Sequence, residues 1–72
     1  MDLCNRLKKV RLQKGLTQES LGQTVGVTRQ TIIAIEKAKF RPSVELALKL
    51  AAALNTPLQG IFWIGINKGE TS

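Results

Sequence analysis

Residues 16–37 read LTQESLGQTVGVTRQTIIAIEK. The stretch predicts two short helices, because Thr17 and Thr28 each precede a helical pattern and carry a hydroxyl that can cap its first turn. Between the helices, Gly26 accepts the left-handed backbone of a tight turn, and Gly22 keeps the helix crossing free of a side chain. The apolar side chains expected to face inward are Leu21, Val25, Val27, Ile32 and Ile35. We therefore predict a helix-turn-helix in this stretch.

Apolar residues on either side of the helix-turn-helix, which spans about residues 18–37, predict two further helices. Leu3, Leu7 and Val10 recur with helical spacing, so we expect an amphipathic first helix before the motif. After the motif, Ser43 caps a fourth helix that is apolar on many sides. We expect this fourth helix to lie at the centre of the core.

The end of the chain predicts one more helix and leaves room for a strand. A capping Thr followed by Pro predicts a short fifth helix over about residues 57–62. Residues 63–66 are apolar and β-prone, which is compatible with a short C-terminal strand that pairs with residues 1–4. Residues 67–72 form a polar tail. The predicted fold class is all-α, a compact domain of five helices.

Composition limits the kinds of protein that this chain can be. Its 72 residues suffice for a single domain, residues 1–72, with a small core. Eleven Lys and Arg against five Asp and Glu give a net charge of +6, which favours a polyanionic partner such as nucleic acid. A basic surface also serves solubility alone, so charge by itself leaves both interpretations open.

Several classes of function are disfavoured by residues that the chain lacks. It has no His and no Tyr, no paired carboxylates at a useful spacing and no Gly-rich phosphate loop, so we expect no enzyme activity and no catalytic residue. Cys4 is the only cysteine, so we expect no internal disulfide and no Cys/His metal site. The sequence shows no signal peptide or membrane-spanning stretch. We therefore expect a cytoplasmic protein with no membrane partner, cofactor or small-molecule ligand.

Four short stretches resemble the phage repressor and Cro (XRE) family, namely residues 16–21, 26–32, 35–36 and 41–43. Together with the core pattern, the resemblance covers about residues 3–62. It implies a lambda-repressor-like fold and a sequence-specific regulator of transcription that binds double-stranded DNA in the nucleoid. It also implies a repressor that binds a palindromic operator as a homodimer. An antitoxin-like or adaptor module, which uses the same fold to bind a protein, is the alternative.

The resemblance assigns base reading to the start of the third predicted helix. Arg29 suits the paired acceptors of guanine, and Gln30 suits the donor and acceptor that adenine presents. Ile33 and Ala34 follow on the side expected to be exposed, where an apolar group can touch a thymine methyl. Ile33 is also compatible with an ordinary exposed apolar residue.

Contacts to DNA phosphates are implied on both sides of this helix. Gln18 stands at the N-terminus of the second helix, where backbone N–H groups attract anions. Thr28 suits either a phosphate contact or a cap alone. The loop of residues 37–42, in which Phe40 should pack onto the core, contributes the cations Lys37, Lys39 and Arg41. Ala38 departs from the family, which usually has Gly there, so a left-handed backbone at Ala38 would add about 1 kcal/mol of strain.

Two sets of residues are expected to hold the structure together. The resemblance implies an ion pair between Arg11 and Glu36 that joins the first helix to the third, and we interpret this pair as structural. Ile61 and Phe62 are assigned mainly to the core. Four other apolar residues near the end of the chain suit a dimer interface, although they are also compatible with simple closure of the core: Leu58, Trp63, Ile64 and Ile66.

Overall fold

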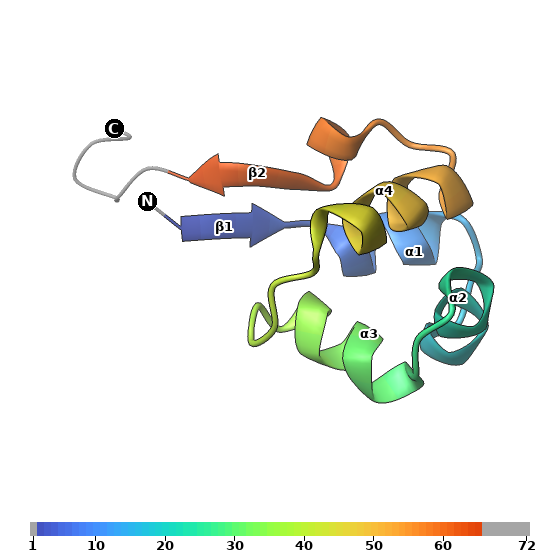
Figure 1. Cartoon of the computed structure of the whole chain (residues 1–72). Coiled ribbons are helices and arrows are strands. Elements are labelled where there is room, and N and C mark those ends of the chain that lie inside the picture. The colour runs from blue at the N-terminus through green and yellow to red at the C-terminus, as the bar shows by residue number, and fades with distance from the viewer. Residues whose placement is uncertain (1, 66–72) are drawn as a thin grey trace.

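Four α-helices, one 3-10 helix and two strands make up residues 2–65, the part of the chain that the computed structural model describes. In chain order they are β1 (Asp2–Asn5), α1 (Leu7–Gln13), α2 (Gln18–Val25), α3 (Arg29–Glu36), α4 (Val44–Ala53), η1 (Leu58–Gly60) and β2 (Phe62–Gly65). Figure 1 shows the helices gathered at one side, with α3 below α1 and α4, and the two strands running away from them side by side. The predicted helix-turn-helix is therefore α2 and α3.

The caps predicted for α2, α3 and α4 are present, whereas Thr56 caps no helix and its hydroxyl donates to the carbonyl of Leu54. Thr17, Thr28 and Ser43 each accept a hydrogen bond at the side-chain hydroxyl from the backbone N–H three residues later, at 2.9, 3.3 and 3.1 Å. Each bond satisfies an N–H that has no partner inside the helix. At the opposite ends of α1 and α2, Gly15 and Gly26 have φ of 72° and 83°. Glycine adopts this left-handed backbone without strain, so both helices can end there, and α2 stops at the turn that the sequence predicts at Gly26.

Gly22 allows the turn after α2 to fold back closely against the helix. A Cβ atom at this position would lie 2.7 Å from the carbonyl oxygen of Val27, closer than real Cβ contacts allow. The turn brings α3 against α2, and the predicted inward residues take part in the core. The buried hydrophobic residues are Leu7, Val10, Leu21, Val25, Ile32, Ile35, Leu50, Leu54, Ile61 and Phe62.

The two strands form an antiparallel ribbon in which Asp2 lies opposite Gly65 and Asn5 opposite Phe62. The strand that the sequence left as an option is therefore present, and it pairs with the start of the chain. The ribbon also corrects the first predicted helix, which begins at Leu7 and not at Leu3. Leu3 fits a helical spacing but lies in β1, because β2 supplies hydrogen-bond partners for this segment that a local sequence pattern does not reveal.

Asn5 ties the ribbon to two helices. Its side-chain oxygen accepts a hydrogen bond from the backbone N–H of Leu7 at 3.0 Å, at the start of α1. Its Nδ2 donates to the backbone carbonyl of Ile35 near the end of α3, also at 3.0 Å. A single amide thus satisfies a free donor of one helix and a carbonyl of another. The ribbon and α3 are joined directly through this side chain.

Three predictions about the remaining elements are wrong. The fifth helix is only the single 3-10 turn η1, because the chain enters β2 directly afterwards. Helix α4 is not central: Val44 and Leu48 are 75% and 52% exposed, and Leu50 is the buried residue within the helix. Phe40 is 47% exposed and does not join the buried core; it borders a surface hollow of about 280 Å³ together with Ile35 and Phe62.

Candidate nucleic-acid interface

Helix α3 presents its first turn to solvent. Arg29 and Gln30 are both exposed, and Thr28 before them is exposed while it caps the helix. The cap holds the helix start in place, because the Thr28 hydroxyl contacts both the backbone N–H and the hydroxyl of Thr31. The opposite face of α3 carries the buried Ile32 and Ile35. Burial of that face fixes which side of the helix faces outward.

Ile33 and Ala34 are less exposed than the sequence predicts. Both are half-buried, whereas Arg29 and Gln30 are fully on the surface. Half-burial leaves part of each apolar side chain available to a ligand that covers α3. Half-burial also agrees with Ile33 as an ordinary, partly exposed apolar residue, the alternative that the sequence pattern left open.

The Arg11–Glu36 ion pair is present and joins α1 to α3. The Nε atom of Arg11 lies 2.6 Å from a carboxylate oxygen of Glu36, and the two side chains are only 7% and 4% exposed. Arg11 also donates to the backbone carbonyl of Leu16 at 2.8 Å, just before the cap of α2. A buried pair of this kind needs further hydrogen bonds to offset its desolvation. Here those bonds fix the loop that leads into α2.

Gln18 makes a contact that the sequence analysis did not predict. Its Nε2 atom donates to Oε1 of Glu36 at 3.1 Å. The first residue of α2 and the last residue of α3 are therefore bonded through their side chains. Eighteen residues separate the two in sequence, so no local pattern points to this bond. Gln18 and Arg29 also line one small hollow with Thr17 and Glu19, which brings the starts of α2 and α3 together.

The loop after α3 carries three exposed cations, Lys37, Lys39 and Arg41. Ala38 has φ of 59°, the left-handed conformation that usually calls for Gly. The backbone N–H of Ala38 donates to the carbonyl of Ile35, and that of Lys39 to the carbonyl of Ala34, both at 2.9 Å. These two bonds are the pattern that closes helices with a left-handed residue. The loop therefore makes this left-handed turn even though an alanine stands there.

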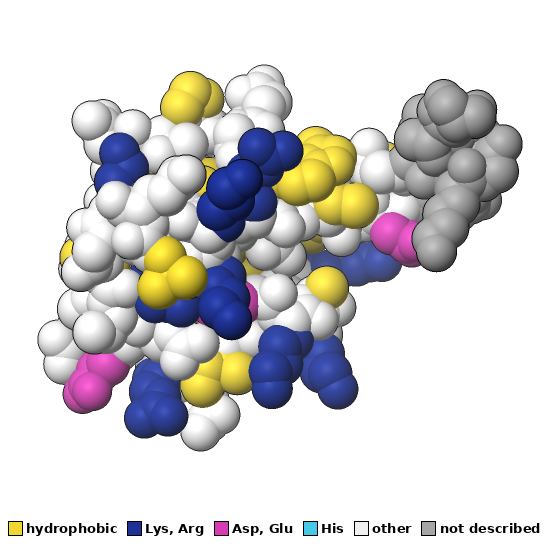
Figure 2. Space-filling view, turned by 180° about the vertical axis from the view of Figure 1, so that it is seen from behind, with side chains coloured by type: hydrophobic (Ala, Val, Ile, Leu, Met, Phe, Trp, Pro, Cys, Tyr) yellow, Lys and Arg dark blue, Asp and Glu magenta, His cyan; other side chains and the backbone are white. Residues whose placement is uncertain are grey.

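Basic side chains dominate the charged surface around α3. Figure 2, which shows the molecule from behind, has dark blue side chains across this face and along its lower edge, where α3 lies, with few acidic ones between them. Lysine and arginine outnumber acidic residues eleven to five over the chain. A positive face beside an exposed helix N-terminus attracts anions.

The residues predicted for a dimer interface fall into three groups. Trp63 and Ile64 on β2 are 37% and 58% exposed, so the ribbon carries apolar surface outside the core. The guanidinium of Arg6 lies 4.8 Å from the centre of the Trp63 ring, a cation–π contact. Leu58 is half-buried and packs against the core. Ile66 lies outside the described residues.

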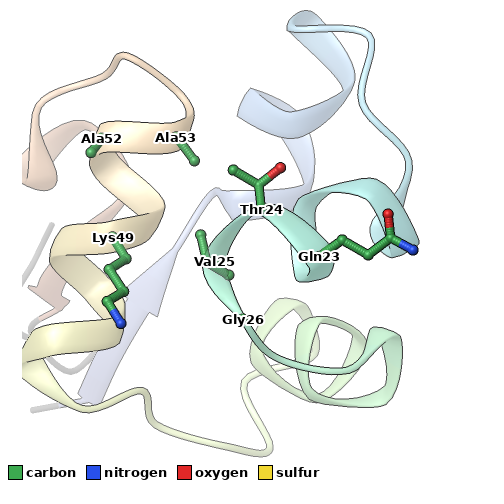
Figure 3. Close-up of a pocket in the computed structure, with 7 residues that line it drawn as sticks. All are labelled: Gln23, Thr24, Val25, Gly26, Lys49, Ala52 and Ala53. Atoms are coloured by element: carbon green, nitrogen blue, oxygen red, sulfur yellow. The ribbon is translucent and has the colours of Figure 1, made fainter.

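A surface hollow of about 580 Å³ lies away from α3, between the end of α2 and α4. In Figure 3 the side chains of Thr24 and Val25 face α4, and Ala53 faces α2 across the hollow. Lys49 is the charged residue of its lining and pairs with Glu45 at 3.1 Å. Across residues 2–65 no cluster of metal-ligating side chains is found, nor a helix able to span a membrane.

Comparisons with known proteins agree with this geometry. The helix-turn-helix family matches residues 7–61. The regulator YgzD of Bacillus subtilis, described as a helix-turn-helix-type transcriptional regulator, is 48% identical over 60 residues, which is 83% of this chain and 91% of YgzD. A regulator of the same type from Methanocaldococcus jannaschii is 50% identical over 58 residues, 81% of this chain and 88% of that protein.

Solved structures show the same arrangement. The restriction-modification controller protein C.AhdI from Aeromonas hydrophila superposes with a TM-score of 0.73 at 34% identity, covering 76% of this chain and 80% of C.AhdI. A DNA-binding protein from Bacteroides fragilis, so described in its crystal structure, gives a TM-score of 0.79 at 28% identity over 85% of this chain and 98% of that protein. The matched region includes α2 and α3.

Proposed function

This chain belongs to the helix-turn-helix (XRE) family of transcriptional regulators, and from that membership we propose that it binds double-stranded DNA sequence-specifically to control transcription. One observation carries the proposal: the first turn of α3 is exposed and carries Arg29, and the exposed basic loop follows the end of the same helix. An α-helix of this kind fits the major groove of B-DNA, where each base pair presents a distinct pattern of donors and acceptors.

Base reading is proposed for the exposed side of α3. Arg29 offers two parallel N–H groups to O6 and N7 of guanine, and Gln30 offers a donor and an acceptor to N6 and N7 of adenine. Their position in the first turn supports this role, because recognition helices contact bases mainly through their N-terminal residues. Ile33 and Ala34 supply apolar surface for thymine methyl groups, limited by their half-burial.

Phosphate contacts are proposed for residues that border α3. They position the protein on the duplex and carry no sequence information. Gln18 acts from the start of α2 and Thr28 from the start of α3. The remaining contacts come from the loop, whose backbone is held against the end of α3, through Lys37, Lys39 and Arg41.

We further propose that the protein acts as a repressor and binds a palindromic operator as a homodimer. One α3 reads only a few base pairs, so two copies are needed for half-sites about one helical turn, near 34 Å, apart. The exposed Trp63 and Ile64 on the ribbon support an interface there. Leu58 and Ile66 are assigned to the same interface. Occupancy of the operator then blocks transcription.

Binding to DNA as a function of salt concentration tests the core of the proposal. With three loop cations at the phosphates, the logarithm of the affinity should fall with the logarithm of salt with a slope of about −3 per bound chain. Selection of binding sites from random DNA should then yield an operator with two related half-sites. Weak binding that does not respond to salt would contradict DNA binding and favour the adaptor alternative.

A further inference from the structure

We infer that Glu36 is a positioning residue for DNA binding, because its carboxylate holds the side-chain amide of Gln18 in the orientation that a phosphate requires. The inference rests on the proposed function and deepens it. It gives the buried Arg11–Glu36 pair a role in addition to joining α1 and α3. Three contacts support the inference: Gln18 to Glu36, Arg11 to Glu36, and Arg11 to the backbone before α2.

The chemistry of the amide explains why its orientation matters. The side chain of Gln18 has an N–H₂ end with two donors and a carbonyl end that only accepts. A phosphate oxygen accepts hydrogen bonds, so only the N–H₂ end can bind it. A carboxylate also only accepts, and Oε1 of Glu36 lies 3.1 Å from Nε2 of Gln18. Glu36 therefore selects the same end of the amide that a phosphate needs.

One donor of this amide remains available. The bond to Glu36 uses one N–H of Nε2, and among residues 2–65 no acceptor is found for the second. Gln18 is half-buried and lies at the edge of the hollow that it shares with Arg29. A phosphate at the start of α2 can accept this second N–H together with the backbone N–H groups of the first turn.

Arg11 offsets the negative charge that the Glu36 carboxylate would otherwise place close to a DNA phosphate. An isolated Glu36 carboxylate would repel DNA. Arg11 contacts both carboxylate oxygens, at 2.6 and 3.4 Å, and both side chains are almost completely buried. The pair is neutral as a whole. Because Arg11 also binds the carbonyl of Leu16, the same side chain fixes the approach to α2, where Gln18 begins the helix.

A thermodynamic cycle in which DNA affinity is measured tests the inference. Gln18→Ala is made in the natural background and in the double variant Arg11→Met/Glu36→Leu. Apolar replacement of both members of a buried ion pair is often tolerated, so the double variant is expected to fold, which thermal unfolding checks. Gln18→Ala should lower affinity about three- to tenfold in the natural background. In the double variant, where Gln18 has already lost its partner Glu36, Gln18→Ala should cause no further loss of DNA affinity.

Two readouts separate positioning from a general loss of structure. The loss caused by Gln18→Ala should be equal for operator and random DNA, because a phosphate contact carries no base information. The salt slope should not change, because a neutral amide displaces no counterion. An equal loss in both backgrounds, or no loss in the natural one, overturns the positioning role alone. Absence of any DNA binding overturns the proposed function with it.

The protein with its natural Arg11–Glu36 pair offers a second measurement. In ¹⁵N NMR spectra, one side-chain amide proton of Gln18 should be shifted by the bond to Glu36 and stay shifted when DNA is added. The other should move on DNA binding. The exposed Gln23 serves as the solvated reference, and Gln18→Ala identifies the signals. Return of the first proton to the position of a solvated amide on DNA binding would overturn the inference.

Discussion

Gly22 sets how closely the turn can approach α2. The carbonyl oxygen of Val27 would lie 2.7 Å from a Cβ atom at this position, and the obstacle is backbone, which cannot rotate away. We expect Gly22→Ala to lower the free energy of unfolding by about 1–3 kcal/mol, although alanine favours the helix itself. Urea unfolding measures this change. Gln23→Ala, at the exposed neighbouring position, is the control and should leave the midpoint nearly unchanged.

Arg29 and Gln30 carry the proposed sequence preference. Replacing either with alanine should relax the preference at one or two base pairs and lower discrimination there by about 1–3 kcal/mol. Affinities for the operator and for single-base variants of it provide the measurement. Lys49→Ala on α4, away from α3, is the control. An even loss across all sequences would contradict base reading by these residues.

At the level of single residues, the sequence predicted what depends on neighbours along the chain. The capping hydroxyls of Thr17 and Thr28 and the left-handed Gly26 were found where expected, because each acts within three residues of its own position. The bond from Gln18 to Glu36 was missed, since the two meet only after α2 and α3 have packed. The prediction that Phe40 packs onto the core was wrong, because the apolar character of a loop residue does not reveal whether the fold brings it into the core.

The connection between α3 and α4 is an element under local strain. Ala38 holds a φ of 59°, which disfavours residues with a Cβ atom. Ala38→Gly should therefore stabilise the protein by up to about 1 kcal/mol, less the entropy that glycine adds to the unfolded chain. Thermal unfolding checks this expectation. Ala52→Gly, at an exposed site within α4, should instead destabilise by a similar amount.

The same loop should supply affinity without specificity. Lys39→Ala is expected to weaken binding to all DNA sequences alike and to reduce the magnitude of the salt slope by about 1. Lys49→Ala removes the same charge from α4 and should leave both quantities nearly unchanged. Titrations of operator and random DNA at several salt concentrations measure both the affinity and the salt slope. Selective loss of operator binding would assign Lys39 to base reading instead.

At the level of elements, the motif itself was more predictable than what surrounds it. Helices α2 and α3 have caps, stop signals and apolar spacing that agree with each other, and their bounds follow. Leu3 was placed in a helix because its spacing with Leu7 fits one, but pairing with β2 outweighs that local preference. The predicted fifth helix is only the single turn η1, because β2 begins directly after it.

At the scale of the whole molecule, the ribbon is the proposed interface between two copies. A two-stranded ribbon is marginal on its own, and Ile64 is 58% exposed on it. We expect a dimer in solution at micromolar concentration, and Ile64→Lys should shift it to monomer. Leu48→Lys is the matched control, since Leu48 is 52% exposed on α4. Light scattering measures the mass, and a monomer that stays monomeric on DNA would contradict the proposed interface.

The overall charge of the molecule was informative only in combination with the fold. A net charge of +6 predicted a polyanionic partner but not which surface meets it. The structure places Arg29 at the start of α3 and the loop cations after its end, whereas Lys49 lies on α4 in an ion pair. The geometry of the proposed dimer could not be predicted from the sequence, because it depends on how the ribbons of two copies meet.

The ribbon also has a consequence for how the protein forms during translation. It joins Asp2–Asn5 to Phe62–Gly65, so the two strands are separated by nearly all of the described chain. Ile61 and Phe62 are buried members of the core and are made just as late. While the ribosome still covers them, β1 has no partner and Leu7 faces an incomplete core. Folding therefore finishes only after residue 65 has left the exit tunnel, and a nascent chain arrested earlier should remain open to protease.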